Sequence, residues 1–138
     1  MYKYFREHRI KVLLIPLIVY WIFLFIGTSL PSDHLSSVLD LSDKLKHFIA
    51  YFVLAFLLSL NFFFQEKWEG IAKYYLLYTL MICTIYGGLD ELHQNLVPNR
   101  SAEFYDWLAD ILGSSLGVLL SYFFLKIIKK NKHNLETN

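Results

Sequence analysis

The feature that most limits the possible folds is a run of 19 residues without a formal charge, residues 12–30. A helix of that length crosses a hydrocarbon core of about 30 Å, and lipid requires backbone polar groups to be satisfied within the segment. Hydrophobic residues make up 56% of the chain and charged residues 18%, against about 25% charged in soluble domains. The sequence therefore predicts an all-α integral membrane protein.

Further apolar runs follow the first one along the chain. The predicted spans are residues 12–30, 44–64, 73–92 and 104–128. With short links between them, they predict a single domain over residues 1–138, an up-and-down four-helix membrane bundle with short loops.

The segments outside the spans have their own expectations. A cleaved signal peptide is the competing interpretation of the first run, but its length and Pro16 favour an uncleaved span. Residues 31–42 are expected to form a short amphipathic turn at the membrane interface. Residues 129–138 are expected to be a flexible basic tail.

The distribution of basic residues predicts the orientation. Ten Lys and Arg residues lie with the termini and the 65–73 link, and three lie in the two opposite loops. The positive-inside rule then places both termini in the cytoplasm and the polar loops outside. This topology brings the start of the second helix, residues 90–103 and the start of the fourth helix to one membrane face.

Asp43, His47 and Tyr51 are spaced i, i+4, i+8 at the start of the second helix, so they share a face. A carboxylate four residues from an imidazole can orient its tautomer. The alternative is a solvated helix end, with Lys44 and Lys46 snorkelling to the interface.

Asp90 shares a helical face with His93 and Gln94. An Asp-x-x-His pair is a way in which helix bundles present metal ligands, and His47 would extend the set. A hydrogen-bonded loop anchor is the alternative. Glu91 is expected to point to another face and to be solvated.

Glu103, Asp106 and Asp110 form an acidic stripe at i, i+3, i+7. Asp110 should be deepest, where an unpaired charge is costly. Arg100 either pairs with Glu103 or Asp106 or grips a phosphate or carboxylate of a ligand; the sequence leaves both open.

A ridge of small residues adjoins the stripe and predicts tight helix packing. It consists of Ala109, Gly113, Gly117 and Ser121. Gly113 and Gly117 also offer a surface for a homo-oligomer.

These patterns define the candidate sets. The candidate catalytic residues are Asp90, His93, His47, Asp106 and Asp110; the candidate ligand-binding residues are Arg100, Lys44, Tyr51, Glu91 and Gln94; the candidate ligands of a divalent metal ion are His47, Asp90, His93 and Asp110. The net charge of +1 argues against a nucleic-acid partner.

Four ordered motifs carry a resemblance to a known family. They are S-D-K-x-x-H-F-x-x-Y (Ser42 to Tyr51), Y-G-x-x-D-E-x-H-Q (Tyr86 to Gln94), V-P-x-R-S (Val97 to Ser101) and D-W-L-A-D-x-x-G-S-x-x-G (Asp106 to Gly117). Together they resemble the VanZ-like family of small bacterial membrane proteins, over about residues 10–128. The resemblance implies a multipass plasma-membrane protein of the kind named for low-level teicoplanin resistance, and it supplies no agreed catalytic residues. Asp110 stands where Asn is common in the family, which argues against a mechanism that needs a neutral amide there.

Three functional hypotheses follow. In the first, an outward-facing acidic/His site processes a lipid-linked envelope intermediate by acid–base or metal-assisted chemistry. In the second, the same site recognises a peptidoglycan precursor, an envelope lipid or a partner protein without chemistry and limits access of the glycopeptide to its target; a glycopeptide is itself a possible partner. The third is an ion-coupled carrier, for which four helices offer little pathway.

Overall fold

The computed structural model describes residues 1–31 and 43–136, and that part of the chain contains helices and no strand. The helices are α1 (Tyr2–Glu7), the π-helix η1 (Ile10–Leu14), α2 (Ile15–Ser29), α4 (Asp43–Phe64), α5 (Glu69–Lys73), α6 (Tyr75–Gln94) and α7 (Phe104–Glu136). The amphipathic turn expected over residues 31–42 lies, apart from Pro31, outside the described residues.

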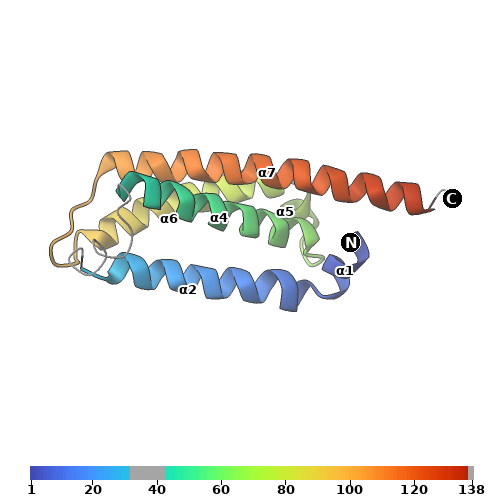
Figure 1. Cartoon of the computed structure of the whole chain (residues 1–138), viewed down its shortest axis with the longest axis horizontal. Helices are drawn as coiled ribbons and strands as arrows, with labels where there is room; N and C mark the ends of the chain where they lie inside the picture. The colour runs from blue at the N-terminus through green and yellow to red at the C-terminus, as the bar shows by residue number, and fades with distance from the viewer. Residues whose placement is uncertain (32–42, 137–138) are drawn as a thin grey trace.

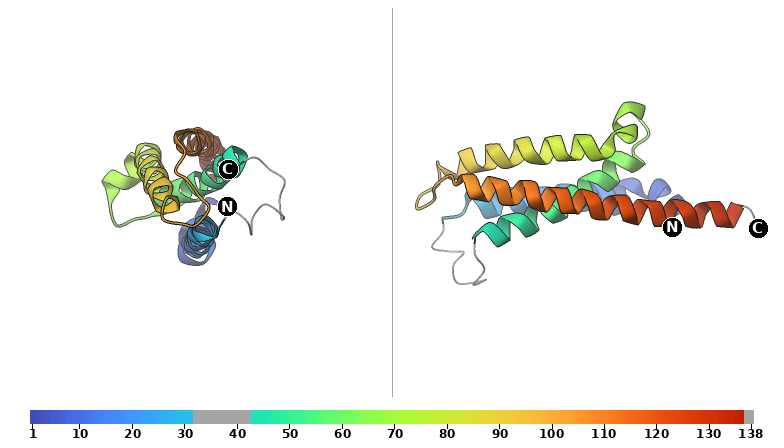
Figure 2. Two further views of the ribbon diagram at one scale, coloured as in Figure 1. Left: turned by 90° about the vertical axis from the view of Figure 1, so that its left-hand side faces the viewer. Right: turned by 90° about the horizontal axis from the view of Figure 1, so that it is seen from above.

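The four longer helices α2, α4, α6 and α7 lie lengthwise beside one another, and each runs opposite to the one before it (Figure 1). Viewed along their length they form one group (Figure 2). Helix α7 packs against both α4 and α6, and α2 packs against α4 and α6. Met1 and the C-terminal end of α7 lie at the same end of the molecule.

Three stretches are long and apolar enough to cross a membrane: Ile10–Ser29, Asp43–Phe64 and Phe104–Asn131. They match three of the predicted spans closely. Helix α6 has the length, but its last turns carry Asp90, Glu91, His93 and Gln94, which lower its hydropathy. The described residues thus form an all-helical protein with three candidate spanning helices.

The first span has a wide turn near its start. Pro16 lies in the first turn of α2, where it has no N–H to donate to the preceding turn. The five residues before α2 form η1, in which backbone bonds reach one residue further than in an α-helix. The span therefore continues through the proline without a break.

Two glycines hold α7 against α4. A Cβ on Gly113 would lie 2.1 Å from the Phe48 carbonyl oxygen, and one on Gly117 would lie 2.3 Å from that of Phe52. No side chain fits at either position, so glycine is required for this close approach. The packing role predicted for the ridge is confirmed. At Gly113 and Gly117, through which a homo-oligomer was expected, α4 of the same chain is the neighbour.

The start of α7 at Phe104 agrees with the prediction, and its end does not. The N–H groups of Ala102 and Glu103, just before the helix, bond to Asn95 and Glu91. The helix continues past residue 128 to Glu136, through most of the predicted flexible tail. The segment after residue 125 is rich in lysine. Lysine has a high helix propensity, and its positive charge interacts favourably with the dipole at the C-terminal end of a helix.

Candidate functional site

A buried histidine–carboxylate pair links α4 to α7. Nδ1 of His47 lies 3.0 Å from Oδ1 of Asp110. Because a carboxylate oxygen accepts, Nδ1 carries the proton and donates it to this bond. In the neutral imidazole that leaves Nε2 as an acceptor with a lone pair. Asp110 is fully buried and His47 is 9% exposed.

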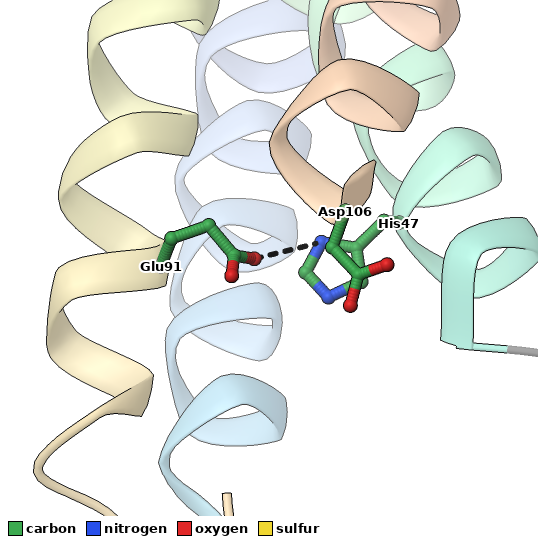
Figure 3. Close-up of side chains that lie close together, drawn as sticks. All are labelled: His47, Glu91 and Asp106. Carbon is green, nitrogen blue, oxygen red and sulfur yellow. Dashed lines mark ion pairs between the residues drawn. The ribbon is translucent and has the colours of Figure 1, made fainter. Parts of the chain in front are cut away.

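Glu91 and Asp106 complete the group. Oε1 of Glu91 lies 3.7 Å from Nδ1 of His47, and one ligand atom each from His47, Glu91 and Asp106 lies within 4.8 Å of the other two. Figure 3 shows these side chains meeting from α4, α6 and α7. Both carboxylates are 5% exposed. We call His47, Glu91, Asp106 and Asp110 the polar centre.

Some oxygens of the polar centre have no hydrogen-bond partner. They are Glu91 Oε1 and Asp110 Oδ2, whereas Asp106 Oδ1 faces the Lys44 ammonium at 3.3 Å. The second oxygen of Glu91 is occupied, since Oε2 accepts the N–H of Glu103 at 2.7 Å. Buried carboxylates without partners are destabilising unless a proton or a cation neutralises them.

Lys44 forms the solvent-facing rim of the centre. Its ammonium lies 2.9 Å from Glu103 Oε2 and 3.3 Å from Asp106 Oδ1. Lys44 is therefore a partner of two acids that the sequence offered to Arg100. Arg100 is partly exposed and makes no ion pair within the described residues.

Glycine and tryptophan residues shape the contact between α6 and α7. A Cβ on Gly87 would lie 2.8 Å from Asp110 Oδ2 and 3.3 Å from Trp107 Cδ1. The indole N–H of Trp107 donates to the Thr84 carbonyl at 2.9 Å. Trp107 thus packs on α6 rather than serving only as an interfacial aromatic, and Gly87 makes room for Asp110.

The structure separates part of the predicted metal set. His47 and Asp110 meet, but His93 does not join them. Its ring stacks on Phe25 with centroids 5.3 Å apart, and Nε2 lies 3.1 Å from the Ser29 hydroxyl of α2. Asp90 is buried and accepts a bond from Gln94 at 3.4 Å. His93 is positioned as an anchor to helix α2, whereas the alternative drawn from the sequence was an anchor to a loop.

Two further expectations change. Asp43 is exposed and pairs with Lys46 at 3.0 Å, so Asp110, and not Asp43, orients His47. Tyr51 is 2% exposed with its ring against Tyr86, and its hydroxyl has no hydrogen-bond partner. Tyr51 therefore lies in the packed interior and not at an open surface.

Glu91 is the residue that sequence reasoning placed wrongly, as a solvated side chain. A signal for it existed. Glu91 follows Gly87 by four residues and Gly88 by three, so it shares their helical face. Glycines mark the face of a membrane helix that packs closely, and this indicated that Glu91 turns inward.

A separate hollow lies at the opposite end of the molecule. Its volume is about 760 Å³, and its lining includes Arg6, Arg9, Lys11 and Lys67. Residues of the polar centre do not line it. The polar centre is closed by its own side chains, with Lys44 at the edge.

Comparisons with known proteins agree with the sequence motifs. The family model described as VanZ/LLP1 matches residues 4–126. An uncharacterised protein of Schizosaccharomyces pombe is 31% identical over 87 residues, which cover 62% of this chain and 50% of that protein. The chain thus spans about half the length of the curated relative it matches. No solved structure matches.

Proposed function

Because the chain belongs to the VanZ/LLP1 family over residues 4–126, we propose that its polar centre binds and processes a lipid-linked ligand of the cell envelope. The protein is a VanZ-like membrane protein with apolar helices of spanning length. The resemblance implies a bacterial plasma membrane and a link to teicoplanin tolerance, and both belong to the proposal.

The proposed topology has four crossings. Helix α6 would be the fourth span, its polar last turns shielded by α4 and α7 rather than exposed to lipid. Both termini would lie in the cytoplasm, as the basic residues predict, and the polar centre would lie at the outer face. The position of Met1 and the end of α7 at one end of the molecule supports an even number of crossings.

The observation that carries the proposal is the convergence of one histidine and three buried carboxylates from three helices. Ionisable groups at the end of an apolar bundle are costly, and they are typically retained where a function uses them. Packing alone would be served better by apolar side chains of similar volume.

The rim supports an anionic, lipid-linked ligand. Lys44 supplies positive charge at the edge of the polar centre, Arg100 adds a second cation in the loop before α7, and both side chains pair well with a phosphate. Such a ligand reaches the site from the membrane plane. The relative in a yeast favours a lipid phosphate over a peptide of the bacterial wall as the recognised part, because yeast makes no peptidoglycan.

Purified chain in lipid nanodiscs tests the proposal with an undecaprenyl-pyrophosphate-linked precursor. We expect binding and turnover by the natural sequence, and loss of turnover in His47→Ala and Glu91→Gln. Asp43→Asn is the matched control, since its carboxylate is exposed on the same helix end and lies outside the centre. Absence of both binding and turnover would overturn the proposal.

Closure of the polar centre by its own side chains favours one other candidate, a binding module that shields its ligand. In that case the precursor binds at Lys44 and Arg100 and no product forms. His47→Ala would then leave binding and teicoplanin tolerance intact, while Lys44→Met would weaken both.

A further inference from the structure

We propose that the polar centre holds one divalent transition-metal ion, Zn²⁺ or Mn²⁺ in class, bound by Nε2 of His47 and by the carboxylates of Glu91 and Asp106. This deepens the proposed function and rests on it for the use of the ion. The residues differ from the set expected from sequence, since Glu91 and Asp106 take the places of Asp90 and His93.

The donor atoms are close to coordination distance. One atom from each of the three side chains lies within 4.8 Å of the other two. Ligands about 2.1 Å from an ion in a tetrahedral site stand roughly 3.4 Å apart, so the side chains need to close by about 1 Å. Glu91 Oε1 lies 3.7 Å from Nδ1 of His47, so its carboxylate has to turn toward Nε2 for the ion to bind there.

The free atoms are the ones that an ion needs. Glu91 Oε1 is buried and accepts no hydrogen bond, and Asp106 Oδ1 is buried with the Lys44 ammonium as its partner at 3.3 Å; both residues are 5% exposed. A cluster kept only for packing would have satisfied the Glu91 oxygen with a donor. Their convergence on one histidine ring indicates a missing positive partner.

Asp110 acts as a positioning residue. A metal-binding histidine typically donates its other ring N–H to a carboxylate, which fixes the tautomer and the ring orientation. The bond from Nδ1 of His47 to Asp110 Oδ1 at 3.0 Å has that form. It directs the lone pair of Nε2 away from Asp110, and Nε2 makes no hydrogen bond to the described residues.

The charge balance also favours a cation. Glu91, Asp106 and Asp110 bring three buried carboxylates to the centre, and Asp90 lies buried nearby. Lys44 offsets at most one of them, because it divides its contacts between Asp106 and the exposed Glu103. A divalent ion neutralises two further charges in a region of low dielectric.

The donor set selects the class of ion. Imidazole nitrogen with two carboxylate oxygens suits Zn²⁺ or Mn²⁺, whereas Mg²⁺ and Ca²⁺ prefer oxygen donors alone. Three protein ligands leave an open position. When bound, the ion supplies a Lewis acid that polarises a phosphate oxygen of the ligand.

The test is metal binding by the full chain, purified in detergent, stripped with chelator and titrated with Zn²⁺, Mn²⁺ or Co²⁺ alone. We expect about one ion per chain and, for Co²⁺, absorption bands of a site with nitrogen and oxygen donors. Glu91→Gln and Asp106→Asn should each weaken binding at least tenfold, while Asp43→Asn, an exposed carboxylate on the same helix end, should bind like the natural chain.

Two outcomes would overturn the inference. One is a natural chain that stays folded and binds no more ion than the Glu91→Gln/Asp106→Asn double variant. The other is equal weakening by Asp43→Asn, which would indicate nonspecific surface binding. The spectrum of the natural chain decides the matter even if a variant fails to fold.

Failure of the metal site can be distinguished from failure of the proposed function. A chain that binds metal but neither binds nor turns over the lipid-linked precursor refutes the proposed function and leaves the metal site standing. A chain that turns over the precursor after complete metal removal refutes the metal site alone.

Discussion

His47 shows how one bond decides what a side chain can do. With Nδ1 committed to Asp110 at 3.0 Å, Nε2 is the atom left for chemistry. The ring owes its orientation to a residue 63 positions away on another helix, whereas Asp43, four residues before it, turns to Lys46. Local spacing alone therefore pointed to the wrong carboxylate.

Asp110 contributes both a hydrogen-bond acceptor and a negative charge, and two substitutions test these properties separately. In Asp110→Asn the amide oxygen still accepts the His47 N–H, so we expect stability within about 1 kcal/mol of the natural chain and metal affinity reduced roughly 10- to 100-fold. Asp110→Leu removes the acceptor and should cost about 1–3 kcal/mol. Thermal unfolding in detergent and metal titration measure the two effects. Equal behaviour of the two variants would contradict this division.

Gly87 and Gly88 form a matched pair of neighbours. Gly87→Ala places a methyl group 2.8 Å from Asp110 Oδ2, whereas in Gly88→Ala the nearest atom, Trp107 Nε1, is 3.5 Å away. We expect Gly87→Ala to destabilise by about 1–3 kcal/mol through overpacking. Gly88→Ala should be neutral or stabilising, since alanine favours helix by up to about 1 kcal/mol. Thermal unfolding in detergent compares them, and a Gly87→Ala as stable as Gly88→Ala would argue against tight packing at Asp110.

The sequence predicted the direction of some side chains of the polar centre and not of others. The inward direction of Asp106 and Asp110 followed from the small-residue ridge beside them. The exchange of Glu91 for His93 was missed, because these residues point about 200° apart and the inward face of α6 was assigned from the Asp90–His93 spacing instead of from Gly87 and Gly88. The contact of His93 with Phe25 depends on where α2 lies, which no local pattern specifies.

Among the helices, α4 and α7 form the closest pair, and α2 is the most peripheral. Only 17% of the α2 span is buried, compared with 44% for α4 and 39% for α7. Its exposed residues, Ile18, Val19, Ile22, Phe23 and Ile26 among them, are the ones expected to face acyl chains. The tight core is therefore built by the helices that carry the polar centre.

Removing the close approach of α4 and α7 should weaken that core. Gly113→Ala and Gly117→Ala each place a Cβ within 2.3 Å of a backbone oxygen of α4, which cannot rotate away. We expect each to cost more than about 2 kcal/mol, at or above the middle of the overpacking range. Gly27→Ala is the control, because nothing lies within 4 Å of its added methyl group. Heat-induced unfolding in detergent gives the comparison, and equal melting of all three would contradict the packing.

The length of the apolar runs predicted which segments form helices. It predicted less well where each helix ends. The α4 span matched within a residue. The predicted start of α7 at residue 104 was correct, whereas the helix ends at Glu136 and not at residue 128. Apolar run length does not locate that end, because the helix continues through a lysine-rich segment.

For the whole molecule, the fourth crossing can be tested by labelling. In a Cys83→Ala background, Leu96→Cys and Lys67→Cys place single thiols on exposed residues after and before α6. If α6 crosses and the termini are cytoplasmic, a membrane-impermeant maleimide labels Leu96→Cys in intact cells and Lys67→Cys only after permeabilisation. Labelling of both from one side would contradict the crossing, and the reversed pattern would contradict the orientation.

The overall class was readable because lipid admits few solutions for an apolar chain, and three predicted spans recur in the structure. Helix α6 is harder to assign, since its polar turns are matched to neighbouring helices and not to the solvent. Hydropathy evaluates a helix as if lipid surrounded it on every side. In a bundle, neighbouring helices cover part of its surface, so that part can be polar.

Because the parts of the polar centre come from α4, α6 and α7, the ribosome completes this group only when it has made the last long helix. Until Asp106 and Asp110 arrive, His47 and Glu91 lie in the bilayer or the translocon without their final neighbours. A nascent chain interrupted before α7 keeps His47 without the carboxylate that orients it. Biogenesis of this protein is thus coupled to its chemistry: a chain that has not been finished has neither a stable core nor a centre.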